Sequence, residues 1–227
     1  RIALLDHITS PTGMILPVEK LVPALQARGV EVLVDGAHAP GQVALDLAKL
    51  NAEYYTGNLH KWLCAPKGAA FLHARADRQD GLHPTVISHG LGQGFLAEFD
   101  WTGTRDPSAA LSVPAALDFH ARLGGTALRA RNRALAAEGA ALVARRLNTD
   151  VGASGAMAGA MGVVRLPVAP DRAGALRDRL LELGTDAPVH AIDGSVLVRI
   201  SAFAYNRIED YAALADLLAR AMREGGA

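Results

Sequence analysis

The chain has 227 residues, of which 50% are hydrophobic and 20% are charged, a composition ordinary for globular proteins. Lys and Arg together number 23, as do Asp and Glu, so the sequence lacks the charge excess that binds nucleic acid or anionic lipid. The single cysteine, Cys64, excludes an internal disulfide framework and fits a reducing cytoplasm, and no apolar run approaches the ~18 residues of a membrane-spanning helix.

Short apolar segments alternate with helical segments up to about Pro114. Residues 1–7 (RIALLDH) predict a buried strand with no polar lead-in, as expected of a chain that begins inside a domain. Continuous apolar strands separated by helices are typical of a parallel sheet covered on both faces, which binds ligands at the carboxyl ends of its strands. The remaining elements predicted in this part are a helix at 18–30 closed by Gly29, a strand at 31–39, a short helix at 43–52, and strands at 53–58 and 68–75.

The sequence pattern changes after Pro114, where an Ala- and Arg-rich segment with helical spacing begins. This segment is expected to be interrupted at Gly124-Gly125. A strand, a helix, a hairpin and a closing helix follow, which predict a small α+β domain. We therefore expect 1–114 to be part of a large domain, and 115–227 to hold a linking helix and the small domain. The elements predicted here are the helices at 114–148, a weakly structured segment at 149–162, a strand at 161–168, a helix at 172–184, a hairpin at 188–203 turning at Asp193-Gly194, and a helix at 206–224 with Asn206 as its N-cap.

One lysine lies in an unusual setting: Lys61 stands between a histidine and a tryptophan, among turn formers and apolar segments. Asp35 ends an apolar strand 26 residues earlier, where an acid without a partner is costly. One helix and one strand separate the two residues, so we expect them at the same edge of the sheet. An amine that forms a Schiff base and a carboxylate that keeps a pyridine nitrogen protonated indicate a pyridoxal phosphate site. Taken alone, Asp35 is a helix cap or turn former, and Lys61 is a solvated surface lysine.

Five separated motifs carry a resemblance to a known family: DHITSPTGMILPVEKL, VLVDGAHAPGQ, YYTGNLHKWLCAPKGAAFL, WTGTRDPSAALSVPAALDF and VRISAFAYN. With them the chain resembles the class V aminotransferases of the fold-type I pyridoxal-phosphate enzymes, most closely the isopenicillin N epimerase-like branch. The resemblance spans nearly the whole chain. It implies a partial α/β fold of that type, with a mostly parallel sheet, flanking helices and a small C-terminal α+β domain. It also implies a further N-terminal portion, which carries a phosphate-binding turn and the side chain that stacks on the cofactor.

The resemblance implies pyridoxal 5'-phosphate as cofactor and an amino acid as substrate. Lys61 would be the Schiff-base lysine and the proton shuttle, and Asp35 would hold the pyridinium nitrogen. His38 falls where relatives use Gln or His near the phenolic oxygen of the cofactor. Ser10 falls where some relatives place an Asn on that same oxygen.

Further roles concern the phosphate and the substrate. Asn58 and His60 would contact the phosphate, and Thr104 matches a residue that reaches it from the partner subunit, which implies a homodimer with shared active sites. Arg199 would grip the substrate carboxylate through a bidentate pair, and Arg105 is a second candidate for an anionic group. Without the motifs, each has an ordinary interpretation: a core histidine, a turn threonine, or an arginine paired with a nearby acid.

The residues leave the reaction open among transamination, epimerisation and carbon–sulfur lysis at Cβ. Epimerisation needs a second acid–base group, for which His7, Tyr205 and His190 cannot be ranked. Cysteine desulfuration needs a mobile cysteine near the substrate, and the only thiol belongs to Cys64, three residues after Lys61. We therefore predict that the protein is not a cysteine desulfurase.

Other classes of protein fit less well. The eight histidines are scattered and form no zinc motif, so no metal is expected, and the sequence lacks the Gly-x-Ser-x-Gly motif of serine hydrolases. The non-enzymatic alternative is an inactive fragment kept as a dimerising scaffold.

Overall fold

A computed structural model describes residues 1–152 and 155–224. The chain forms two compact units. The first contains Arg1–His7 and Pro17–Ala121, and the second contains Ile8–Leu16 and the chain from Arg122 onward. No helix in the described ranges is long and apolar enough to cross a membrane.

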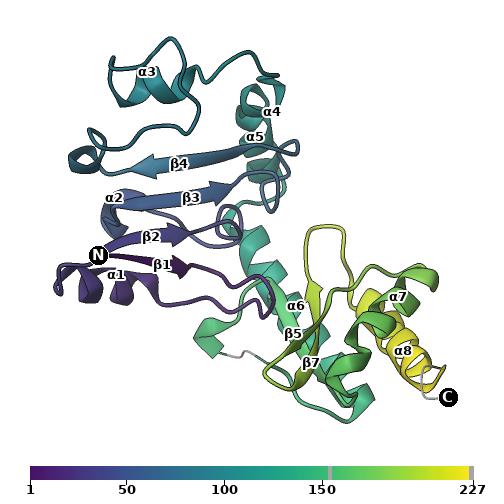
Figure 1. Cartoon of the computed structure of the whole chain (residues 1–227). Helices are drawn as coiled ribbons and strands as arrows, with labels where there is room; N and C mark the ends of the chain where they lie inside the picture. The colour runs from purple at the N-terminus through teal and green to yellow at the C-terminus, as the bar shows by residue number, and fades with distance from the viewer. Residues whose placement is uncertain (153–154, 225–227) are drawn as a thin grey trace. The chain divides into compact units, whose positions relative to one another are not determined.

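The first unit is built on a four-stranded sheet whose strands lie in chain order (Figure 1). The first three strands run parallel, as predicted, and the fourth runs antiparallel to the third. A parallel neighbour would need a crossover of a dozen or more residues, whereas the segment between the last two strands contains only turns. The sheet is therefore mostly parallel with one antiparallel edge. Its strands are β1 (Ile2–Asp6), β2 (Glu31–Asp35), β3 (Tyr54–Asn58) and β4 (Ala70–Ala74).

Burial alternates along the strands of this sheet. Val32 and Val34 of β2 are fully buried, while Leu33 and Asp35 between and after them are half-buried. On β1, Ile2 is 62% exposed. Within the described residues, the sheet is therefore covered more completely on one face than on the other, which differs from the predicted burial of both faces.

The helices of the first unit begin and end at residues with clear local signals. The first ends with Gly29 at a φ of +67°, and the N–H of Val30 donates to the Leu25 carbonyl, the bond that closes a Schellman motif. The second begins at Asp46, whose carboxylate accepts the N–H of Lys49. The helices are α1 (Val18–Gln26), α2 (Leu47–Leu50), α3 (Phe95–Asp100), α4 (Ser108–Leu111) and α5 (Val113–Arg122), with a 3₁₀ turn at Ala76–Arg78.

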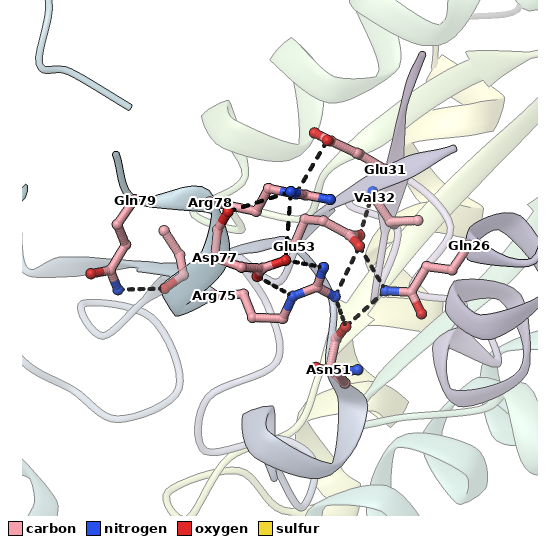
Figure 2. Close-up of polar contacts among 10 residues, drawn as sticks. Gln26, Glu31, Val32, Asn51, Glu53, Arg75, Asp77, Arg78 and Gln79 are labelled. Carbon is pink, nitrogen blue, oxygen red and sulfur yellow. Dashed lines mark hydrogen bonds and ion pairs between the residues drawn. The ribbon is translucent and has the colours of Figure 1, made fainter. Parts of the chain in front are cut away.

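A buried carboxylate ties together several elements of the first unit (Figure 2). Glu53, which is 3% exposed, accepts the backbone N–H of Val32 at 2.9 Å and the amide of Gln26 at 3.0 Å. Arg75 pairs with the same carboxylate at 2.9 Å. Glu53 precedes β3, Val32 lies near the start of β2, and Arg75 follows the antiparallel β4. The cluster therefore lies at the edge of the sheet opposite to the carboxyl ends of β2 and β3.

The second unit packs helices against a three-stranded antiparallel sheet, in which β7 (Ser195–Ser201) lies between β5 (Met161–Leu166) and β6 (Val189–Ile192). The predicted hairpin is present: Asp193 and Gly194 both have positive φ, as a type I′ turn requires. The helical region breaks at Gly124-Gly125, as predicted. The elements are α6 (Thr126–Leu147), β5 (Met161–Leu166), α7 (Ala173–Glu182), β6 (Val189–Ile192), β7 (Ser195–Ser201) and α8 (Ile208–Glu224), with 3₁₀ turns at Gly155–Met157 and Pro170–Arg172.

Two local predictions need comment. Asn206 does not cap α8 with its side chain, since its amide oxygen accepts the N–H of Phe203 instead. The carboxylate of Asp210 reaches back to the N–H of Arg207, which is the reciprocal half of a capping box. In the segment predicted to be weakly structured, residues 153 and 154 lie outside the described part of the chain.

Candidate active site

Asp35 and Lys61 lie after the carboxyl ends of neighbouring parallel strands. β2 ends at Asp35, which is in register with Thr56 of β3, and β3 ends at Asn58. Lys61 follows in the turn after β3. Because parallel strands end at the same edge of a sheet, the segments that follow β2 and β3 emerge there together, as predicted.

His38 connects these two segments. It is buried in the turn after β2, and its Nε2 lies 3.3 Å from Nζ of Lys61. The indole N–H of Trp62 donates a hydrogen bond of 3.3 Å to Nδ1 of the same ring. Trp62 is buried, whereas Lys61 is exposed. The structure therefore brings two predicted site residues, His38 and Lys61, into direct contact at a solvent-accessible edge.

The turn that carries His38 is fixed by tight packing at its start. A Cβ added at Gly36 would lie 2.1 Å from the hydroxyl of Tyr55, so only glycine fits there. Tyr55 is fully buried and its hydroxyl lies 2.8 Å from Nδ1 of His7. Burial and the charge of Asp35 raise the pKa of Tyr55 far above its ordinary value, so its phenol remains protonated. The end of β2 at Gly36 is therefore packed tightly against the buried Tyr55 ring.

The carboxylate of Asp35 lies in an acidic environment. Its Oδ1 accepts the N–H of Ala37 at 2.8 Å, and its register partner on β1 is a second acid, Asp6. Burial, followed by the charge of Asp35, raises the pKa of Asp6. Within residues 1–152 and 155–224, neither carboxylate has an ion-pair partner. Two adjacent, half-buried acids of this kind would be stabilised by a cationic ligand.

Asn58 and His60 flank the same edge. Asn58 lies two residues after Thr56, so by strand alternation it shares the face of the sheet that carries Asp35. Nδ1 of His60 lies 2.9 Å from the Ala69 carbonyl and donates to it, because a carbonyl oxygen can only accept. The ring is thereby oriented, and its Nε2 is the atom left to meet a ligand. To donate from Nε2 to a phosphate oxygen, the imidazole must carry a second proton.

Thr104 and Arg105 are exposed and lie between α3 and α4. In the described ranges, neither makes a hydrogen bond or ion pair with Asp35, His38 or Lys61. Arg105 instead lines a cavity of about 670 Å³ together with residues of β4 and α3. The structure of the single chain therefore does not bring these two residues into the His38–Lys61 cluster.

Ser10 and Arg199 meet within the second unit. Arg199 lies on β7 between two buried residues, and its Nη1 donates to the Ser10 carbonyl and lies 3.4 Å from the Ser10 hydroxyl. Its Nε is buried without a hydrogen-bond partner, and among the described residues no carboxylate pairs with the guanidinium. Burial lowers the pKa of Arg199. This is a half-buried cation that still lacks an acidic partner.

Sequence reasoning missed two residues of this site. Trp62 was noted in the sequence only as a neighbour of Lys61 and was given no role, although it donates a hydrogen bond to His38. Its position directly after Lys61, together with its single N–H donor, was the available signal. Asp6 was not singled out, and only the strand register reveals that it neighbours Asp35.

A lysine and an aspartate after adjacent parallel strands, with a small α+β unit, define the fold-type I class of pyridoxal-phosphate transferases. The solved structures agree: the apo structure of cysteine desulfurase from Thermococcus onnurineus NA1 matches with a TM-score of 0.79, over 96% of this chain and 59% of its own, at 19% identity. The family model for aminotransferase class-V matches residues 1–166, and the chain belongs to this family, whose members depend on pyridoxal phosphate.

Named relatives divide between two activities. The isopenicillin N epimerase of Streptomyces clavuligerus is 36% identical over 96% of this chain and 59% of its own length. The L-cysteine desulfhydrase of Arabidopsis thaliana is 34% identical over 99% of this chain and 55% of its own length. The chain thus spans little more than half the length of the relatives it matches.

The exclusion of cysteine desulfurases was wrong. Relatives named L-cysteine desulfhydrases match nearly the whole chain, and the structural neighbours are named cysteine desulfurases. The exclusion relied on the absence of a suitable thiol other than Cys64. Sulfur can also leave a substrate by elimination across Cα and Cβ, which requires no thiol of the protein, so counting cysteines cannot exclude cysteine as a substrate.

Proposed function

We propose that the protein containing this chain is a pyridoxal-phosphate-dependent enzyme that acts at Cα or Cβ of an amino-acid substrate through Lys61. An aminotransferase or isopenicillin N epimerase-like reaction is the first candidate. When bound, pyridoxal phosphate supplies an electron sink for the bonds at the substrate Cα. The observation that carries the proposal is the 3.3 Å contact between Lys61 and His38, which places a lysine amine beside the turn that follows Asp35.

The residues present fit this cofactor. Asp35 and Asp6 are adjacent acids with no ion-pair partner in the described chain, so a protonated pyridine nitrogen would provide the missing cation. Lys61 is exposed and can supply the amine that holds the aldehyde carbon. The same Nζ can then carry a proton to and from the substrate Cα. His38, fixed by Trp62, would contact the cofactor near its phenolic oxygen.

Binding of the phosphate would involve Asn58 and His60. Asn58 shares the face of Asp35, and His60 is oriented by its bond to Ala69 so that a protonated Nε2 could donate to a phosphate oxygen. Thr104 is proposed to reach the phosphate of a partner subunit, which would explain why its side chain is exposed within one chain.

Recognition of the substrate is assigned to Arg199, with Arg105 as a second candidate. The guanidinium of Arg199 is half-buried, and among the described residues its Nε has no hydrogen-bond partner while its Nη1 donates to the uncharged groups of Ser10. A substrate carboxylate would satisfy it through a bidentate pair. We keep Ser10 as a proposed ligand of the phenolic oxygen.

A carbon–sulfur lyase is the second candidate, favoured by the 34% identity to an L-cysteine desulfhydrase over 99% of the chain. The residues required are the same, since a proton is taken at Cα by Lys61 in both cases. The difference lies in whether a group leaves from Cβ.

The assembly and location are also part of the proposal. A homodimer with shared active sites would supply Thr104 in trans, and a single cysteine suits a cytoplasmic, transferase-type enzyme. Residues 1–114 would belong to the large cofactor-binding domain, and residues 115–227 to a linking helix and the small domain.

Addition of pyridoxal phosphate tests the role of Lys61. The full-length protein should develop a visible absorption band, and borohydride reduction followed by peptide mass mapping should place the cofactor mass on Lys61. Lys61→Ala should lose the band, whereas Lys67→Ala, which changes an exposed lysine six residues away, should keep it. A wild-type protein without the band, or a band that survives Lys61→Ala, would overturn the proposal.

Incubation with a panel of amino acids in deuterated water distinguishes the reactions. Deuterium at Cα with the amino group retained and the configuration inverted indicates epimerisation, and a keto acid that keeps the substrate's carbon skeleton and Cβ substituent indicates transamination. Release of sulfide and pyruvate from cysteine indicates carbon–sulfur lysis.

A further inference from the structure

We propose that Trp62 fixes the tautomer of His38 and so raises the fraction of Lys61 whose amine is unprotonated and nucleophilic. The inference deepens the proposed function and rests on it in one respect, namely that Lys61 is the reacting amine. It makes Trp62 a positioning residue, acting on the amine through the imidazole.

The first step follows from what an indole can do. The Nε1–H of tryptophan is a donor only, and it points to Nδ1 of His38 at 3.3 Å. Nδ1 must therefore keep its lone pair, which excludes both the Nδ1–H tautomer and the doubly protonated ring while this bond is made. The one remaining form of His38 is neutral, with its proton on Nε2.

The second step concerns the amine that faces Nε2. Lys61 Nζ lies 3.3 Å from Nε2 of His38, so the imidazole N–H is within hydrogen-bond reach of that nitrogen. An ammonium group has three donors and no acceptor, so a protonated Lys61 would set a donor against a donor. A neutral amine has a lone pair and can accept the bond. While His38 is the Nε2–H tautomer, the contact is therefore favourable only when Lys61 is an unprotonated amine.

The gain is chemical, because only the free amine is a nucleophile. A lysine with an ordinary pKa of about 10.4 is unprotonated in roughly one molecule in a thousand at pH 7.5. A net hydrogen bond worth about 1.4 kcal/mol, selective for the neutral form, would raise that fraction about tenfold.

The turns that carry His38 and Trp62 are held in place by their surroundings. His38 and Trp62 are buried, and the carbonyl of His38 accepts a hydrogen bond of 3.0 Å from the Gln42 amide. A Cβ added at Gly41 would lie 2.7 Å from the Trp62 carbonyl oxygen, so the two turns are in close contact. The backbone that carries each of the two rings is therefore fixed, and both side chains are buried.

The tautomer can be read directly. In protein labelled with ¹⁵N-histidine, two-bond ¹H–¹⁵N correlation spectra at pH 7.5 should show His38 as the neutral Nε2–H form, assigned by the signals that vanish in His38→Gln. In Trp62→Phe the same ring should become a mixture of tautomers or take up a second proton. A wild-type His38 found as the Nδ1–H tautomer or as imidazolium overturns the proposal, whether or not the variant folds.

The reactivity of Lys61 gives the second readout. Limited acylation with acetic anhydride at pH 7.5, resolved by peptide mass spectrometry, should label Lys61 about tenfold more slowly in Trp62→Phe than in the wild type. The exposed Lys67 of the same sample serves as the internal reference and should be labelled at an unchanged rate. An unchanged rate at Lys61 would contradict the proposal.

A pair of substitutions at His38 separates hydrogen-bond order from packing. In His38→Gln, the carbonyl can accept from Trp62 and the amide N–H can donate to Lys61, so the Lys61 rate should stay within about threefold of the wild type. His38→Met fills similar space without either group, and the rate should fall as in Trp62→Phe. Equal losses in both variants would show a role in packing alone.

These measurements need no cofactor, so the two proposals fail separately. If His38 is the Nε2–H tautomer and the acylation rate of Lys61 depends on Trp62, but pyridoxal phosphate gives no absorption band, the proposed function is overturned. The effect of Trp62 on Lys61 through His38 is then still supported. If the band is present and is lost in Lys61→Ala, but His38 is a mixture of tautomers, the proposed function is supported and the effect of Trp62 on Lys61 is overturned.

Discussion

Replacing Glu53 by alanine is expected to lower the free energy of unfolding of the first unit by about 3 kcal/mol. The largest contribution comes from the N–H of Val32, which would be left buried without its acceptor, at a cost of about 1–3 kcal/mol. Gln26 and Arg75 lose less, because each also bonds the Asn51 carbonyl and Arg75 is partly exposed. Loss of the Arg75 ion pair therefore adds about 1 kcal/mol.

Urea unfolding followed by tryptophan fluorescence measures this change, because Trp62 and Trp101 both belong to the first unit. Glu53→Gln should lose about 2 kcal/mol, since its amide keeps the volume but sets an N–H against a donor. Asp77→Ala, which removes an exposed partner of Arg75, is the control and should not move the midpoint. If Glu53→Ala shifts the midpoint no further than Asp77→Ala does, the argument from buried hydrogen bonds is refuted.

The same carboxylate predicts a pH dependence. Burial raises the pKa of Glu53, but hydrogen bonds from Val32 and Gln26 and the charge of Arg75 outweigh it, so the folded-state pKa lies below its ordinary value of 4.5. The unfolded chain therefore binds its proton first as the pH falls, and stability from this group is present above pH 4.5 and lost below it. The difference between wild type and Glu53→Gln should be constant from pH 8 to about 6 and narrow below about pH 4.5.

Two glycines give further predictions. Gly36→Ala should destabilise the first unit by about 1–3 kcal/mol in the same urea assay, because its Cβ would lie 2.1 Å from the Tyr55 hydroxyl; a neutral result would mean that the strand end adapts. In the second unit, Gly139→Ala should lower the thermal midpoint by circular dichroism, although alanine favours a helix by about 1 kcal/mol, since its Cβ would lie 2.5 Å from the Tyr211 ring. Gly174→Ala in α7, with nothing within 4 Å, should raise the midpoint, and equal signs at the two positions would refute this reasoning.

Features that depend on local chemistry could be predicted from the sequence. Asp193-Gly194 predicted a hairpin turn because few residue pairs tolerate the two positive φ angles that a tight hairpin requires. The pair Gly124-Gly125 ended a helix for the same reason of backbone conformation. Asp35 and Lys61 could be placed at one edge because a strand, a helix and a second strand in order favour a parallel pair.

Features that depend on residues distant in the sequence could not be predicted in this way. The antiparallel direction of β4 (Ala70–Ala74) is set by a connection of turns, and its apolar pattern alone suits either direction. Trp62 acquires its role through a residue 24 positions earlier, which no local pattern reveals. Asn206 is a residue type favoured at the N-cap, but its amide oxygen accepts the N–H of Phe203 in the preceding turn. The carboxylate of Asp210 instead accepts the N–H of Arg207 at the start of α8.

The path of the chain between β1 and α1 constrains how this protein can be divided. Segment 8–16 leaves the first unit after His7, pairs Met14 with Ala158 and offers Ser10 to Arg199, and only then returns to begin α1. If the chain were divided after residue 121, the first piece would contain segment 8–16 without the residues that it contacts. A second piece that starts at residue 122 would lack segment 8–16. The second unit would therefore fold correctly only when the two pieces are present together, so we expect the two pieces to associate and restore the fold when they are produced as separate polypeptides.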